Sequence, residues 1–427
     1  MRAIGKWTKL DNAAKIFPPT SSVGDPKAFR FACELYETVD SQILQKALDK
    51  TVAQFPFYRS VLKKGLFWYY FEESTLRPVV TEEDRQPCAP IYNADGPGLL
   101  FRVCVYKRRI SLEVFHALAD GMGAVHFLRT LVWFYLSEKY PDSAGEGFSL
   151  NEGSSQEQVR QDAFEKYYDK KKNFKNLKAE RAYRVKGSCL PEHRIGIMEG
   201  VLSVKSVLKI AHEYHASLTE FLTTLMICSV HDEMAVRDCT RPVVISVPAD
   251  LRHYFKTQTA RNFFGIIHIS HSFQTCGDSF TDVLENVKRS FQEQLNPETM
   301  LGIINRFCTL ENNAVIKAIP LAIKIPCLKF AGRHAEGEDT AAVSNLGKIT
   351  MPPEMNSHIR LFSIMVSNRR PQICLCSFGD TLTIGYSARL ESTDLPRRFF
   401  RRLVELGIRV EINSNMEQAG ENNDDVL

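Results

Sequence analysis

The residues best suited to chemistry lie in the segment EVFHALADGMGAVHFLR, which spans residues 113–129. His116, Asp120 and Gly121 form an HxxxDG pattern there, where an apolar, strand-like stretch meets a helix-like one. Side chains at such strand–turn–helix junctions often face a cleft. Because imidazole titrates near neutral pH, His116 could act as a general base. The spacing alone is weak evidence, since a histidine with a structural role explains a single His–Asp pair more often.

Other reactive residue types lack the companions that a site would need. His253, His268 and His271 lie on or beside predicted strands, without the acidic or sulfur neighbours of a metal site. Cys374 and Cys376 fall on one face of a predicted strand, which is typical of core thiols. No GxSxG, GxxxxGK or GxGxxG pattern occurs, so a serine elbow and the usual nucleotide-binding loops are excluded. We therefore predict no metal site.

The elements around HxxxDG alternate between strand and helix signals. Phe29–Glu37 predicts a strand, and Asp40 is the expected N-cap of the helix that follows it. Leu99–Tyr106 and Ile110–Phe115 predict a hairpin, whose second strand runs directly into His116. In the second half, SLTE at residues 217–220 predicts a capping box. Further strands are expected at 196–203, 242–248, 263–273, 340–349, 359–366, 372–378 and 381–388, and helices at 279–295 and 395–406.

The two halves each contain several strands and about three helices, without a close internal repeat. The chain has 427 residues, 44% of them hydrophobic, which is enough for two lobes with substantial cores. We expect an α+β protein with an N-terminal lobe at 1–165, a crossover linker at 166–190 and a C-terminal lobe at 191–427. The net charge of +4 is too small to suggest a nucleic-acid partner.

Cysteine usage and the N-terminus predict a cytoplasmic protein. The eleven cysteines are scattered without paired CxxC motifs, which indicates reduced thiols rather than disulfides or a zinc site. The first residues carry charges and a proline pair where a signal peptide would need an apolar run.

Two lysine-containing segments leave alternatives open. Ala314–Ala331 is apolar but is interrupted by three lysines and two prolines, so stable membrane insertion is not expected. It predicts an amphipathic helix covering the core or the mouth of a site, with attachment to a membrane surface as the alternative. Lys166–Lys186 contains nine basic and two acidic residues. It is either a solvated linker or a basic rim that attracts a phosphorylated ligand.

Several short motifs occur along the chain together with HxxxDG. They are WTKLDNAAKIFP at 7–18, FPFYR at 55–59, SVPADLR at 246–252, NFFG at 262–265 and SNLG at 344–347. In this order they resemble the condensation-domain and chloramphenicol-acetyltransferase-like acyltransferase superfamily, most closely its bacterial alcohol acetyltransferase-like members. The resemblance implies two chloramphenicol-acetyltransferase-like lobes, each a mixed sheet covered by helices, with a tunnel at their interface.

The resemblance also implies roles for individual residues. His116 would be the general base, and Phe115 replaces the first of two histidines found in peptide-forming members, which favours an alcohol acceptor. Asp120 would form a buried ion pair with Arg252 that fixes the catalytic loop. Gly121 would allow a tight turn beside the substrate.

Further residues have weaker assignments. Ser344 and Asn345 are candidate donors to an oxyanion, although a strand-ending turn would also favour these residue types. Asn262 and Gly265 are expected to shape the lobe interface or the cofactor channel. The expected co-substrate is acyl-CoA, with no permanently bound cofactor, and the expected acceptor is a small molecule. We expect a monomer.

The predicted function is acyl-CoA-dependent O-acyl transfer, with an acetyl group as the expected acyl group and with both substrates bound together. One alternative is an amine acceptor or a carrier-protein-bound donor. A catalytically silent binding or regulatory protein of the same fold is the alternative from another class.

Overall fold

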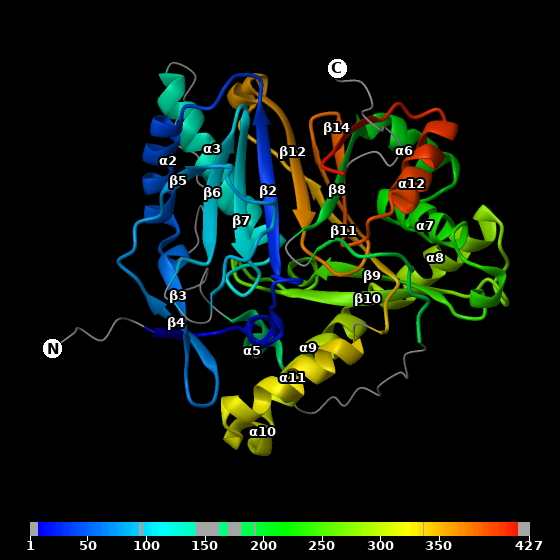
Figure 1. Cartoon of the computed structure of the whole chain (residues 1–427), viewed down its shortest axis with the longest axis horizontal. Coiled ribbons are helices and arrows are strands. Elements are labelled where there is room, and N and C mark those ends of the chain that lie inside the picture. The colour runs from blue at the N-terminus through cyan, green and yellow to red at the C-terminus, as the bar shows by residue number, and fades with distance from the viewer. Residues whose placement is uncertain are drawn as a thin grey trace, which may run out of the picture.

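The computed structural model describes residues 7–93, 96, 98–141, 162–169, 181–191, 194–335 and 337–416. Two main sheets lie beside each other, and helices cover the outer side of each (Figure 1). The first sheet has five strands in the order β12 (Ile359–Val366), β2 (Ala28–Leu35), β7 (Arg109–Phe115), β6 (Phe101–Tyr106) and β5 (Val80–Glu82). Its pairs are antiparallel except β5 with β6, so the sheet is mixed.

The second sheet has seven strands and is also mixed, because β11 is parallel to both of its neighbours. Its order is β10 (Phe264–His271), β9 (Val243–Asp250), β11 (Ala341–Lys348), β13 (Gln372–Phe378), β14 (Thr381–Ala388), β8 (Gly196–Ser203) and β15 (Glu411–Ser414). A small third sheet contains β1 (Trp7–Lys9), β4 (Tyr69–Glu73) and β3 (Ser60–Lys64).

Each main sheet has its own helices and its own core. Helices α2 (Ser41–Gln54) and α3 (Gly121–Lys139) pack together over the first sheet. The second sheet is covered by α6 (Val204–Glu213), α7 (Leu218–His231), α8 (Phe280–Gln294) and α12 (Asp394–Glu405). The α+β class and the two lobes with helix-covered mixed sheets are therefore confirmed.

The remaining helices lie at the lower edge of the molecule in Figure 1 or between the lobes. They are α1 (Phe17–Thr20), α5 (Ala163–Tyr167), α9 (Pro297–Asn312), α10 (Ala314–Ala318) and α11 (Leu321–Ala335). Short 3-10 helices are at Ala13–Ile16, Pro56–Arg59, Val236–Asp238, Leu251–His253 and Pro353–His358. No helix in the described ranges is both long and apolar enough to cross a membrane.

Local signals in the sequence predict the element starts well. Asp40 caps α2 by accepting hydrogen bonds from the N–H groups of Gln42 and Ile43. Ser217 and Glu220 form both halves of the predicted capping box at α7. The sequence analysis did not identify β3, β15 or α9, although the buried Met300, Ile304 and Cys308 of α9 do recur at helical spacing.

One strand crosses between the lobes. β12 follows β11 in the chain but pairs with β2 of the first sheet, so that sheet takes a strand from the segment assigned to the C-terminal lobe. β12 also packs against β14, where Thr383 donates to the carbonyl of Phe362. A side chain at Gly385 would overlap the carbonyl oxygen of Ile364, so glycine permits this close approach. The linker at 166–190 stays a prediction, since its residues 170–180 lie outside the described part of the chain.

Candidate active site

His116 directly follows β7 and is held among aromatic rings. Its backbone N–H donates to the carbonyl of Lys27 at 2.8 Å. Its ring stacks on Phe17 with a centroid separation of 4.4 Å and meets the edge of Phe29 at 5.1 Å. Phe264, at the start of β10, approaches it from the other lobe at 5.6 Å. Side chains from both lobes therefore fix the position of the imidazole.

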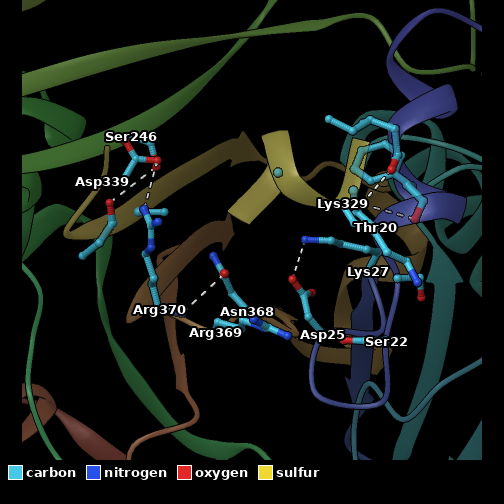
Figure 2. Close-up of a pocket in the computed structure, with 16 residues that line it drawn as sticks. Thr20, Ser22, Asp25, Lys27, Ser246, Lys329, Asp339, Asn368, Arg369 and Arg370 are labelled. Atoms are coloured by element: carbon cyan, nitrogen blue, oxygen red, sulfur yellow. Dashed lines mark hydrogen bonds and ion pairs between the residues drawn. The ribbon is translucent and has the colours of Figure 1, made fainter. Parts of the chain in front are cut away.

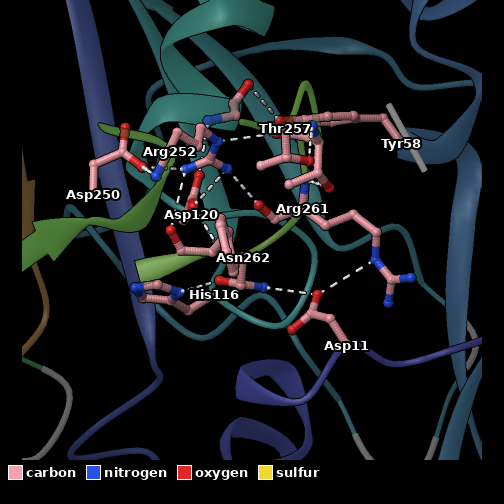
Figure 3. A network of polar contacts seen from close by, with 12 residues as sticks. Asp11, Tyr58, His116, Asp120, Asp250, Arg252, Thr257, Arg261 and Asn262 are labelled. Atoms are coloured by element: carbon pink, nitrogen blue, oxygen red, sulfur yellow. Dashed lines mark hydrogen bonds and ion pairs between the residues drawn. The ribbon is translucent and has the colours of Figure 1, made fainter. Parts of the chain in front are cut away.

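A hydrogen bond across the lobe interface fixes the proton on this ring. His116 Nδ1 lies 3.2 Å from Asn262 Oδ1, and Asn262 Nδ2 donates to Asp11 Oδ2 at 3.3 Å. Figure 3 shows Asn262 between the two side chains. An amide oxygen can only accept, so this contact assigns the proton to Nδ1 of the neutral ring. Nε2 then carries the lone pair, which is the form a base requires.

Burial favours the neutral form of His116. Desolvation lowers the pKa of His116 below its usual value of 6.5, while a hydrogen bond with its own backbone, the nearby Asp120 carboxylate and the bond to Asn262 act in the opposite direction. The balance leaves the ring unprotonated at neutral pH. His116 is thus ready to accept a proton.

Asp120 is fully engaged in structural contacts. It caps α3, because Oδ1 accepts from the N–H of Gly123 at 2.9 Å. Oδ2 accepts from the N–H of Phe263 at 3.0 Å and forms an ion pair with Arg252 Nη2 at 2.9 Å. The side chain is 6% exposed. This arrangement ties the HxxxDG turn to the second lobe rather than directing the carboxylate at a substrate.

Arg252 holds together the segment that faces HxxxDG. Besides Asp120, it pairs with Asp250 at 2.9 Å and donates to the carbonyls of Thr259 and Arg261 at 3.1 and 2.6 Å. The turn that presents Asn262 to His116 is thereby braced by the same guanidinium that neutralises Asp120 (Figure 3).

The two glycines after Asp120 permit close contacts between lobes. A Cβ at Gly121 would lie 2.8 Å from a methyl of Leu346, in the SNLG segment. A Cβ at Gly123 would overlap the backbone carbonyl of Ala260, which cannot move as a flexible side chain can. The sequence pattern singled out Gly121, but Gly123 has the stricter steric requirement.

Of the remaining predicted site residues, Asn262 contacts His116, whereas Asn345, Ser344 and Gly265 have other contacts. Asn345 donates to Thr219 at 2.9 Å and accepts from the N–H of Gly347 at 2.8 Å, so its amide serves the turn after Ser344. Ser344 lies on β11 in register with Cys374, and no described hydrogen bond joins it to His116. A Cβ at Gly265 would lie 3.3 Å from Ile303 of α9, so the glycine leaves room for that side chain. Of the weaker candidates, only Asn262 meets the imidazole.

The sequence reasoning missed Asp11, which lies in the WTKLDNAAKIFP motif. Asp11 is fully buried, accepts from the N–H of Ala14 at 2.7 Å and lies 3.4 Å from Arg261 Nε. Burial raises the pKa of Asp11, although Arg261 and Asn262 oppose this effect. No local pattern marks such a residue, because its side-chain partners Arg261 and Asn262 lie about 250 positions away.

Two cavities lie near the segments that carry the network around His116, although His116 itself lines neither of them. One of about 320 Å³ begins at Phe17, the ring stacked on His116, and is lined by charged side chains (Figure 2). Another of about 1100 Å³ is lined by Leu10, Trp68 and Arg261, on the side of Asp11. Both linings mix polar and apolar side chains, and of the two cavities only the smaller includes residues that contact His116, namely Phe17 and Lys27.

No alternative catalytic group is prominent. In the described ranges, no three His, Cys, Asp or Glu residues are grouped as a metal site would require. Cys374 and Cys376 are fully buried, and burial raises the pKa of each to about 12. Both thiols are therefore protonated and inert at neutral pH.

Solved structures with this architecture are known. The *F. graminearum* TRI101 complexed with coenzyme A and T-2 mycotoxin matches 95% of this chain and 99% of its own, with 11% identity and a TM-score of 0.65. The first condensation domain of the CDA synthetase matches 95% and 97%, with 14% identity and a TM-score of 0.62. The TRI3 trichothecene 15-O-acetyltransferase from *Fusarium sporotrichioides* matches 95% and 98%, with 11% identity and a TM-score of 0.61.

The chain has the condensation-domain fold. At these identities the likeness is one of fold, and it extends over nearly the whole chain. Scans against protein-family models and against curated proteins find no significant match. The acetyltransferases and the condensation domain share this architecture, as the sequence motifs predicted.

Proposed function

We propose that the protein is an acyl-CoA-dependent O-acyltransferase that transfers an acetyl group from a thioester to an alcohol. The observation that carries the proposal is the Asn262–His116 contact, which leaves Nε2 of a buried, neutral imidazole as a base. The fold is shared with TRI101, whose structures contain coenzyme A and a trichothecene. Ser344 and Asn345 remain oxyanion candidates, and Asn345 would first have to exchange its bond to Thr219.

The reaction needs one base and no covalent enzyme intermediate. His116 Nε2 accepts the proton of the acceptor hydroxyl as its oxygen attacks the thioester carbonyl carbon. When the tetrahedral intermediate collapses, the carbon–sulfur bond breaks and the imidazolium returns the proton to the departing thiolate. Asp120 and Arg252 keep the loop in place throughout and take no proton. Direct transfer requires both substrates to be bound at once.

The cavity of about 320 Å³ suits the anionic end of the donor. Its lining includes four cationic side chains, of Lys27, Lys329, Arg369 and Arg370, against two acidic ones, of Asp25 and Asp339. Figure 2 shows Lys27 with Asp25 on one side and Arg370 with Asp339 on the other. The net positive charge would attract the phosphates of coenzyme A. Coenzyme A is a co-substrate in this proposal, not a resident cofactor.

We further propose that the protein is a cytoplasmic monomer. Its N-terminal lobe at 1–165 and its C-terminal lobe at 191–427 are joined by a crossover linker at 166–190. All eleven cysteines are free thiols, which a reducing compartment would maintain.

The proposal is tested by incubating the protein with acetyl-CoA and a panel of alcohols while measuring free thiol. We expect alcohol-dependent release, and a loss of about 10²–10⁴-fold in His116→Ala with an unchanged circular dichroism spectrum. His253→Ala is the control, because that histidine lies outside the network around His116. Release with amines alone would identify an N-acyltransferase, and transfer only from a carrier-protein thioester would identify a condensation-type enzyme. No turnover with any donor would favour a silent binding protein.

A further inference from the structure

Helix α11 turns a row of apolar residues toward the outside of the molecule, unlike an ordinary surface helix. Ile323, Pro326, Cys327 and Phe330 are spaced at i, i+3, i+4 and i+7, so they share one face of the helix. All four are exposed, whereas the opposite side contributes the buried Leu321. A helix on a soluble protein normally turns its polar side outward. The segment predicted to cover the core therefore presents an apolar stripe to its surroundings.

Neighbouring exposed apolar residues extend this stripe. The exposed fractions are 74% for Phe330, 70% for Leu66, 70% for Val315 and 57% for Ile323. Leu66 lies in the turn between β3 and β4. Its backbone carbonyl accepts a hydrogen bond from the N–H of Leu321 at 2.8 Å, so this turn is bound to the start of α11. The turn, α10 and α11 lie at the lower edge of the molecule (Figure 1). We call these residues, together with Pro326 and Cys327, the lower apolar face.

The charges on α10 and on α11 as far as Gly332 are of one sign. Residues 312–332 contain Lys317, Lys324 and Lys329 and no acidic residue. Lys317 and Lys329 are exposed, whereas Lys324 turns inward over the ring of Trp68 at 3.9 Å and donates to the carbonyl of Phe67. Exposed apolar side chains bordered by lysines characterise helices that lie in the interface of an anionic bilayer.

We infer that the lower apolar face docks on the surface of a membrane containing anionic lipid. Phe330, Ile323 and Leu66 would enter the boundary between headgroups and acyl chains, and the exposed lysines would contact lipid phosphates. A second copy of the chain is a poorer occupant, because a symmetric contact would bring the same lysines together. The docking is peripheral, since α11 has 15 residues and α10 has five.

Docking there would bring a lipid surface close to the candidate active site. Lys329 and Gly332 of α11 line the cavity of about 320 Å³. Gly332 also faces Thr20 of α1, and Phe17 of the same short helix stacks on His116. Apolar substrates dissolved in the bilayer would thus be close to the cavity mouth. The inference itself concerns membrane binding and does not depend on the proposed acyl transfer.

The test is co-sedimentation of the purified full chain with vesicles, without substrate. We expect binding to an equal mixture of phosphatidylcholine and phosphatidylglycerol, and much weaker binding to phosphatidylcholine alone. Phe330→Ser should reduce the partition coefficient about tenfold or more. Lys317→Ala should reduce it about fivefold, as expected for one basic residue near an anionic surface.

Matched controls lie on two helices that cover the second sheet, away from the lower apolar face. Val404→Ser removes an exposed valine of α12, and Lys209→Ala removes an exposed lysine of α6, so both should bind like the parent. Failure of the parent to bind mixed vesicles, equal binding to neutral vesicles, or unchanged binding of Phe330→Ser would each overturn the inference. A dimer by light scattering that Phe330→Ser converts to a monomer would assign the face to a second copy and also refute it. Because no turnover is measured, these outcomes are independent of any test of acyl transfer.

Discussion

Asn262 provides the sharpest test of how the site works, because it contacts the imidazole without being able to take part in proton transfer. Asn262→Leu keeps the number and branching of the side-chain heavy atoms but removes the oxygen that accepts from His116 Nδ1 at 3.2 Å. It also removes the donor to Asp11, whose burial already raises its pKa. Asn262 is thus a positioning residue, and its loss should affect the state of the base rather than substrate binding.

The expected magnitude follows from that one contact. A neutral hydrogen bond contributes about 1 kcal/mol, so the ring would hold its productive orientation about fivefold less often. The hydrogen bond of His116 with its own backbone would be the main contact left to hold the proton on Nδ1, so sharing of the proton between the two ring nitrogens adds a further factor of up to about two. We therefore expect kcat to fall about tenfold with little change in KM.

The pH profile adds a readout that a merely structural role would not change. The base must be unprotonated, so kcat/KM falls as the pH drops through the pKa of His116. Burial places that pKa below 6.5, and the bond to Asn262 raises it. Removing the bond should lower the pKa further and move the acidic limb to lower pH.

The assay is steady-state release of free thiol across a range of pH. Asn286→Leu is the matched control, because Asn286 is a buried asparagine that donates to the carbonyl of Ser270 far from His116. We expect its pH limb to match the parent. An acidic limb that stays in place or moves to higher pH in Asn262→Leu would refute the proposed protonation of the ring.

Three further predictions concern the scaffold and the kinetic mechanism. Asp120→Ala and Arg252→Ala should each lower the free energy of unfolding by about 3–5 kcal/mol, and the double variant should lose less than the sum of the two. Additive losses in a cycle of urea denaturation measurements would exclude coupling between the two residues. Gly123→Ala should lower the free energy of unfolding by about 1–3 kcal/mol, because its Cβ would meet the Ala260 carbonyl. Gly98→Ala, whose Cβ would enter open space, should leave it unchanged, and equal stabilities of the two variants would contradict the steric argument. Initial-rate plots for the two substrates should intersect, and intact mass after acyl-CoA alone should be unchanged; parallel lines with an acyl adduct would indicate a covalent intermediate.

The sequence by itself determined the features that depend on nearby residues. Asp40 at α2 and Ser217 with Glu220 at α7 act through hydrogen bonds to groups two or three positions away, so their spacing predicts the element. The HxxxDG junction is local in the same sense, because Asp120 caps α3 through Gly123. The order of the short motifs was enough to predict the two-lobed fold.

Only the tertiary structure decided which distant residues meet. His116 and Asn262 are 146 positions apart, and Asn262 and Asp11 are 251 apart. Likewise, pairing of β12 with β2 and the outward direction of Phe330 depend on how the lobes and α11 pack. The type of a residue limits the hydrogen bonds and ion pairs that it can form. Which distant residue becomes its partner depends on how the lobes pack together, and the spacing of residues along the chain does not specify that packing. For this reason the sequence predicted His116 as the base, whereas the structure alone revealed Asn262 as the partner of its ring.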